Sequence, residues 1–165
     1  MKIANLERNK FIEIFGPLYE NSAFIAEEIY QRGLEKYQDA EEVLISMRNL
    51  VDQMEYKAKL QLILEHPKLG IRKQDTSRLT KHSQVEQKGA GLDRLAEDEF
   101  ENLKSLNDNY MRKFNFPFII AVAGLTKNDI FENINKRLKN NTDKEFQTAI
   151  KEIHKIAKIR LDKIT

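Results

Sequence analysis

Three groups of residues have the types and spacing to do chemistry, and the first is a histidine followed by a proline. His66-Pro67 lies where an apolar helical pattern ends and a polar segment begins. Because proline disfavours helical geometry in the residue before it, a helix should end at or just before His66. The negative end of a helix favours a protonated imidazole, which can donate a proton near neutral pH. The alternative is a histidine that only terminates a helix.

The second group is a polar run that begins at Ser83. Ser83 and Glu86 have the spacing of a capping box, which predicts a helix start. Gln87 lies four residues after Ser83 and therefore shares its helical face, while Gly89 and Gly91 lack side chains and would let a backbone or ligand approach. Helix N-termini also bind anions through their free N–H groups. The run is either a helix cap alone or a cradle for a polar ligand.

The third group is a single arginine within an apolar stripe. Ile153, Ala157, Arg160 and Ile164 are separated by four, three and four residues, which places Arg160 on the apolar face of the last helix. A guanidinium keeps its charge, so in a core it needs a carboxylate, backbone carbonyls or an anionic ligand. Three interpretations stay open: Arg160 reaches the surface, pairs with an internal Glu, or binds an anion.

Other candidates have simpler explanations. His82 precedes Ser83 in a polar segment and is expected to be solvated, and His154 falls among charged residues and is expected on the surface. The basic run 136–140 lies at a predicted helix C-terminus, where cations complement the helix dipole. We therefore do not assign this run to nucleic-acid binding.

Helices must position these groups, because apolar residues recur every three or four positions along nearly the whole chain. This pattern predicts an all-α fold of about eight helices without significant sheet, and aromatic residues at helical spacing should lie in the core. Helix ends are expected at Gly16-Pro17, Gly33 and His66. Helix starts are expected at Asp39 with Glu42, Ser83 with Glu86, Thr126, and Thr142 with Glu145.

Two segments of the second half need separate predictions. A long helix should follow Ser83 and end at Phe114. The stretch from Phe118 to Val122 has strand composition but no partner strand, so a buried turn or short helix after Pro117 is expected. The polar stretch 66–80 is expected to form a surface loop.

Composition limits the class of protein. A length of 165 residues suits one domain, 1–165, with 28 basic and 26 acidic side chains, no Cys and three His. We therefore expect no disulfide, no metal site and no nucleic-acid partner. The longest apolar run, 116–125, is shorter than the roughly 20 residues that span a bilayer, and no leader or peroxisomal signal is recognisable. A cytoplasmic protein without membrane contact is expected.

Four segments in order carry a resemblance to a known family. They are FGPLYENS (15–22), HPKLG (66–70), SQVEQKGAGL (83–92) and KFNFPFIIAVAG (113–124). Together they resemble 2-oxo-4-hydroxy-4-carboxy-5-ureidoimidazoline (OHCU) decarboxylase, the last enzyme on the route from urate to (S)-allantoin. The similarity runs from about Phe11 through the final helix.

The resemblance implies an all-helical decarboxylase without a cofactor, acting on OHCU, with a homodimer as a further expectation. It implies that His66 is the catalytic histidine and Glu86 the catalytic glutamate. The implied substrate contacts are Pro67, Ser83, Gln84, Val85, Glu86, Gln87, Phe118, Ile119, Ile120, Ala121, Val122 and Arg160. In that role Glu86 would orient the substrate and set the charge state of His66.

The sequence departs from the family pattern at three places. Lys68 stands where an acidic residue is common, Asn115 replaces a glycine after KF, and 22–24 reads SAF in place of SPW. The alternative function is a non-enzymatic helical adaptor or small-anion-binding protein, in which the polar segments are only caps. A nucleic-acid binder using 72–81 and the final helix would show steeply salt-dependent binding, and the balanced charge argues against it. A metal-dependent hydrolase lacks a credible ligand set.

Overall fold

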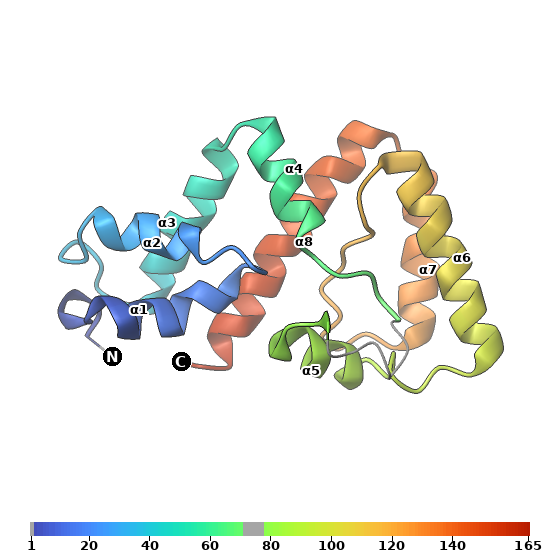
Figure 1. Ribbon diagram of the computed structural model, residues 1–165, viewed down its shortest axis with the longest axis horizontal. Helices are drawn as coiled ribbons and strands as arrows, with labels where there is room; N and C mark the ends of the chain where they lie inside the picture. Colours follow the sequence, from blue (N-terminus) through green and yellow to red (C-terminus); the bar gives the residue numbers. More distant parts are fainter. Residues whose placement is uncertain (1, 71–77) are drawn as a thin grey trace. The chain divides into compact units, whose positions relative to one another are not determined.

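The computed structural model describes residues 2–70 and 78–165, and this part of the chain is helical without a strand (Figure 1). It contains eight α-helices and two short 3₁₀ helices, so the predicted all-α fold is confirmed. The described chain divides into unit 1, Met1–Glu65 with His154–Thr165, and unit 2, His66–Ile153. That residues 1–165 form one domain stays a prediction. Residues 71–77, which hold much of the expected surface loop, lie outside the described residues.

Unit 1 is built from four helices and the end of a fifth. These are α1 (Arg8–Phe15), α2 (Phe24–Gln31), α3 (Ala40–Gln53), α4 (Tyr56–Leu64) and the part of α8 (Thr142–Asp162) from His154 onward. The 3₁₀ helices Ile3–Asn5 and Gly16–Leu18 precede and follow α1. Helix α2 packs against both α1 and α3. The Phe11 and Phe15 rings lie one helical turn apart in a tilted arrangement, with centroids separated by 4.6 Å. Burial of these apolar faces stabilises the unit.

Most helix ends of unit 1 fall where the sequence predicts them. Gly33 follows α2 with φ of 86°, which suits glycine. The Asp39 carboxylate accepts the Glu42 N–H at 3.0 Å at the start of α3, and α4 ends at Leu64, two residues before His66. The expectation that aromatic residues at helical spacing are core residues is wrong for Phe24 and Tyr56, which are 56% and 60% exposed. Each is the first residue of its helix, where fewer neighbouring turns can cover it.

His154 is buried, so its predicted surface position is wrong. Its Nδ1 lies 2.9 Å from the Tyr19 hydroxyl, and its Nε2 lies 2.9 Å from the Asp52 carboxylate. Burial raises the pKa of Tyr19, so its hydroxyl keeps its proton and donates to Nδ1. The neutral imidazole then donates its Nε2–H to Asp52. Both partners lie more than 100 residues away in sequence, and helical periodicity carries no information about such distant contacts.

We expect His154 to make unit 1 less stable in mild acid. Burial lowers the pKa of His154, against the opposing effect of the Asp52 hydrogen bond. His154 therefore binds a proton more readily in the unfolded chain than in the folded one. Its contribution to the free energy of unfolding is fully present above the pKa of the unfolded histidine, about 6.5, and is lost as pH falls below that value. Urea unfolding between pH 8 and pH 5 should show this loss, at most about 1.4 kcal/mol per pH unit for one group. His154→Gln should flatten the profile, and an unchanged profile would contradict the assignment.

Unit 2 contains α5 (Lys81–Gly89), α6 (Glu97–Phe114), α7 (Lys127–Arg137) and the first part of α8. Helices α6 and α7 lie side by side (Figure 1), with an ion pair between Lys127 and Glu99 at 2.8 Å. Thr126 caps α7 as predicted, accepting the Asp129 N–H at 3.2 Å. Thr142 is instead the first residue of α8, and Asn141 accepts the Lys144 N–H at 2.8 Å.

The long helix predicted after Ser83 is two helices. Gly91 has φ of 76°, and Leu92 donates its N–H to the Gln87 carbonyl at 3.0 Å while Gly91 donates to Lys88. These bonds form the glycine-dependent Schellman ending of α5. The helix also begins earlier than predicted, because Thr80 accepts the Ser83 N–H at 3.2 Å and is the capping residue.

The segment 118–122 is buried as expected but forms no helix. A turn follows it at Ala123 and Gly124. Asn115, which departs from the family pattern, ends α6 with φ of 61°. Among the residues other than glycine, asparagine takes this left-handed conformation most readily. The substitution therefore preserves the turn that ends α6. None of the helices in the described ranges is both long and apolar enough to span a membrane.

Candidate active site

His66 opens the segment 66–70, which three side-chain hydrogen bonds hold in place. His66 itself is 7% exposed. The Gln87 amide donates to the Lys68 carbonyl at 3.2 Å and accepts from the Gly70 N–H at 3.0 Å. The Asn107 amide donates to the Leu69 carbonyl at 3.0 Å. The structure therefore brings the loop after His66-Pro67 together with α5 and α6, because buried backbone groups outside regular structure need such partners.

The surroundings of Gly70 show how tightly this segment is packed. Its φ is 70°, and a Cβ there would lie 2.5 Å from Cδ2 of Leu103. Gly70→Ala should therefore destabilise the protein by about 1–3 kcal/mol in chemical unfolding. Gly89→Ala is the matched control, because no atom lies within 4 Å of its added Cβ and alanine favours a helix. Equal free energies of unfolding for the two variants would show that the segment accommodates the added methyl group without strain.

The five predicted contacts on α5 do not share one face. Ser83 and Gln87 are buried, Gln84 and Glu86 are half-buried, and Val85 is 63% exposed. Successive residues turn by about 100° around a helix, so Val85 points away from Ser83 and Gln87. The Gln84 amide donates to the Leu79 carbonyl at 3.1 Å. Whether each of these residues contacts substrate stays a prediction.

The N–H groups that the cradle interpretation needs at Ser83 are already bonded within the protein. Because α5 begins at Lys81, the N–H groups of Ser83 and Gln84 already bond to Thr80. Glycine positions 89 and 91 have open space around the added Cβ positions, so no backbone from the described residues approaches them. Ser83 and Gln87 are the buried polar residues of α5, and the Gln87 amide already bonds to Lys68 and Gly70.

Phe118, Ile119, Ile120 and Val122 are buried, and Ala121 is half-buried. The Ile119 carbonyl accepts a hydrogen bond from Nη1 of Arg137 at 2.6 Å. This segment is therefore apolar and mostly buried, and the Ile119 carbonyl already accepts a hydrogen bond from the protein.

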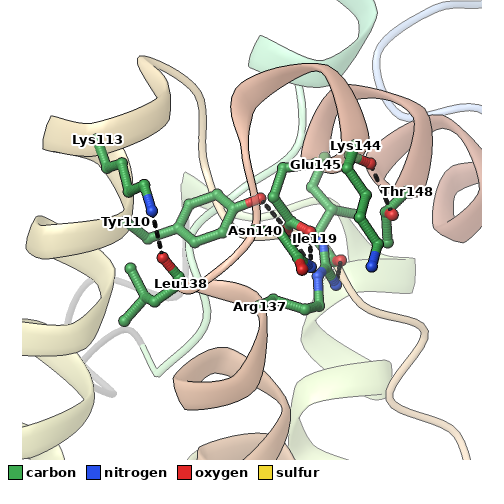
Figure 2. A network of polar contacts seen from close by, with 9 residues as sticks. All are labelled: Tyr110, Lys113, Ile119, Arg137, Leu138, Asn140, Lys144, Glu145 and Thr148. Atoms are coloured by element: carbon green, nitrogen blue, oxygen red, sulfur yellow. Dashed lines mark hydrogen bonds and ion pairs between the residues drawn. The ribbon is translucent and has the colours of Figure 1, made fainter.

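Sequence reasoning missed a buried polar network around Glu145 (Figure 2). Its carboxylate is 0% exposed, and Oε1 accepts from the Tyr110 hydroxyl at 2.6 Å and from Nε of Arg137 at 2.8 Å. Oε2 accepts from the Asn140 amide at 2.9 Å. Burial, and then the bond to Glu145, raise the pKa of Tyr110, so its hydroxyl remains a donor.

The sequence held a signal for this network. Ile130, Ile134 and Arg137 are separated by four and three residues, the same pattern that identifies Arg160. The expectation that the basic run 136–140 serves only the helix dipole is wrong for Arg137, which is 7% exposed and paired with Glu145.

Arg160 belongs to unit 1 and pairs with an internal glutamate. It is 2% exposed, its Nη2 lies 2.7 Å from Oε2 of Glu20, and its Nη1 donates to the Pro17 carbonyl at 2.9 Å. Of the three open interpretations, the surface position is wrong and the internal Glu pair is confirmed. Anion binding stays a prediction. Within the described ranges, no three His, Asp or Glu side chains are grouped to hold a metal.

Comparison with known proteins gives the family of this chain. The family model described as OHCU decarboxylase matches residues 4–162. The 2-oxo-4-hydroxy-4-carboxy-5-ureidoimidazoline decarboxylase of Halalkalicoccus jeotgali is 34% identical over 96% of this chain and 87% of its own length. The uric acid degradation bifunctional protein of Bacillus sp. (strain TB-90) is 37% identical over 99% of this chain, which spans 31% of that protein.

Two solved structures have a similar fold. A crystal structure of (S)-allantoin synthase matches 96% of this chain and 51% of its own chain, with a TM-score of 0.77 and 25% identity. A crystal structure of OHCU decarboxylase in the presence of (S)-allantoin matches 87% of this chain with a TM-score of 0.69 and 23% identity, which supports the fold. Because the family model matches residues 4–162 and a relative of 34% identity is covered over 87% of its length, the chain belongs to the OHCU decarboxylase family.

Proposed function

We propose that this protein decarboxylates OHCU to (S)-allantoin in the breakdown of urate. The family match over residues 4–162 carries this proposal. It is supported by a relative of 34% identity that is named for this activity and that the chain covers over 87% of its length.

The substrate supplies its own electron sink. The name OHCU places the carboxyl and hydroxyl groups on C4 and the ureido group on C5, within a ring that holds one C=N bond. When the bond from C4 to the carboxylate breaks, CO2 leaves and the electron pair forms C4=C5 as the imine nitrogen takes a proton. The hydroxyl then becomes the C4 carbonyl by losing its proton while C5 gains one. One face of C5 must be protonated to give a single enantiomer.

His66 is the group we assign to this proton transfer. Its side chain is buried, and Gln87 and Asn107 fix the backbone that follows it at Leu69 and Gly70. A positioned general acid of this type contributes about 10² to 10⁴ to a rate. Glu86 is assigned to orient the substrate and to set the charge state of His66.

The remaining predicted residues are assigned to binding. Ser83 and Gln87 offer a hydroxyl and an amide on the buried face of α5, and Arg160 offers a cation for the anionic substrate. The buried segment 118–122 supplies an apolar wall that excludes water, which strengthens the polar contacts and prevents protonation of the wrong face. A homodimer and a cytoplasmic location stay predictions.

The test is the rate at which freshly generated OHCU disappears in the presence of the purified chain. We expect a rate that rises in proportion to protein concentration and exceeds the spontaneous reaction. A non-enzymatic adaptor predicts the spontaneous rate at every protein concentration, and that result would exclude the proposed function.

A further inference from the structure

We infer that Arg137 is a positioning residue, which fixes the segment 118–122 for the decarboxylation. The inference rests on the proposed function, because it gives this segment its role as a wall of the substrate site. It assigns to Arg137 no contact with substrate.

The segment needs an external support because it has no regular secondary structure. Arg137 provides two contacts to consecutive residues. Its Nη1 donates to the Ile119 carbonyl at 2.6 Å, and its guanidinium carbon lies 4.4 Å from the centre of the Phe118 ring. A planar guanidinium above an aromatic face is attracted to it, so one side chain fixes both a carbonyl and a ring.

Arg137 is itself held by a buried carboxylate. Its Nε donates to Oε1 of Glu145, and the same oxygen accepts from the Tyr110 hydroxyl (Figure 2). These three residues come from α6, α7 and α8. The Tyr110 ring in turn lies 5.3 Å from the Phe118 ring, at an interplanar angle of 76°. The support is therefore built from the helices of unit 2 and does not depend on a mobile surface side chain.

Stability alone is a poor reason for this arrangement. A buried ion pair costs desolvation that well-packed apolar residues avoid. Moreover, Nη2 of Arg137 is buried and has no hydrogen-bond partner among the described residues, which lowers stability further. The gain is geometric, because the guanidinium reaches Glu145 and Ile119 at once. A lysine ammonium is a single point charge and cannot reproduce this fork.

Arg137→Lys therefore tests the inference, with Asn140→Ala as the matched control. Asn140 bonds to the other oxygen of Glu145 and leaves the bonds of Arg137 to Glu145 and Ile119 in place. We expect kcat, measured per mole of folded protein and well below the melting temperatures of both variants, to fall about 10- to 100-fold in Arg137→Lys. A displacement of the segment 118–122 by about 1 Å can cost this much. The melting temperature of Asn140→Ala should be lower than that of wild type, while its kcat should be the same.

A second measurement does not depend on activity. Hydrogen exchange of the backbone amides in 118–122 should be faster in Arg137→Lys than in wild type, and unchanged in Asn140→Ala. If wild type does not turn over OHCU, the proposed function fails, while the exchange data still decide whether Arg137 positions the segment. Unchanged exchange in Arg137→Lys, or a kcat per folded molecule equal to that of Asn140→Ala, would overturn the inference. If Arg137→Lys does not fold, the double variant Arg137→Met with Glu145→Gln, which removes both charges of this pair, takes its place.

Discussion

Replacing His66 with asparagine should lower kcat for OHCU decarboxylation by about 10² to 10⁴, the contribution of one general acid. Asparagine is polar and of similar size, but it cannot donate a proton to C5 of the intermediate. His66 is 7% exposed, and the bonds that fix its segment come from Gln87 and Asn107, which the substitution leaves in place. Steady-state kinetics at pH 7 on the folded variant measures the effect.

The control for this substitution is His82→Asn. His82 lies in the first turn of α5, is half-buried, and has no role in the proposed machinery. It should keep the wild-type kcat, so a loss confined to the His66 variant identifies the proton donor. Full turnover by His66→Asn would exclude His66 from the chemistry.

Replacing Arg160 with methionine should have the largest effect on stability. Arg160 and Glu20 are both almost fully buried, and their charged atoms lie 2.7 Å apart. Removing one partner of such a pair costs about 3–5 kcal/mol, because the other charge stays in the core. Chemical unfolding of Arg160→Met measures this loss.

The double variant Arg160→Met with Glu20→Gln separates folding from function. It removes both charges, so most of the lost stability should return. Substrate affinity should stay weak if Arg160 also binds the anionic substrate, which would appear as a KM raised above that of wild type. A double variant with wild-type KM would show that Arg160 serves only the internal pair with Glu20.

Local sequence rules predicted the helices better than their exact beginnings. Gly33 and Thr126 act as predicted because a left-handed glycine and a capping hydroxyl depend on neighbouring residues alone. The start of α5 was predicted at Ser83, since Glu86 completes the capping pattern there. Thr80 caps the helix instead, and the bond from Gln84 to Leu79 holds the preceding loop to it. Several residues could cap this helix, and the surrounding chain selects one.

The site residues show the same limit at longer range. The helix end before His66 follows from Pro67, and the burial of Arg160 follows from its apolar stripe. The partners of these groups do not follow from any period, because Glu20 lies 140 residues from Arg160 and Asn107 lies 38 residues from Leu69. In the sequence, Glu145 fits the capping pattern that begins at Thr142. Only the fold shows that it pairs with Arg137.

The handedness of the allantoin shows whether C5 is protonated in an ordered site. Circular dichroism of the allantoin formed from fresh OHCU, with enough protein for the spontaneous reaction to be negligible, should show (S)-allantoin alone. Stereospecific protonation at C5 requires the ordered site proposed around His66. A racemic product formed at the spontaneous rate would exclude an ordered site of protonation around His66.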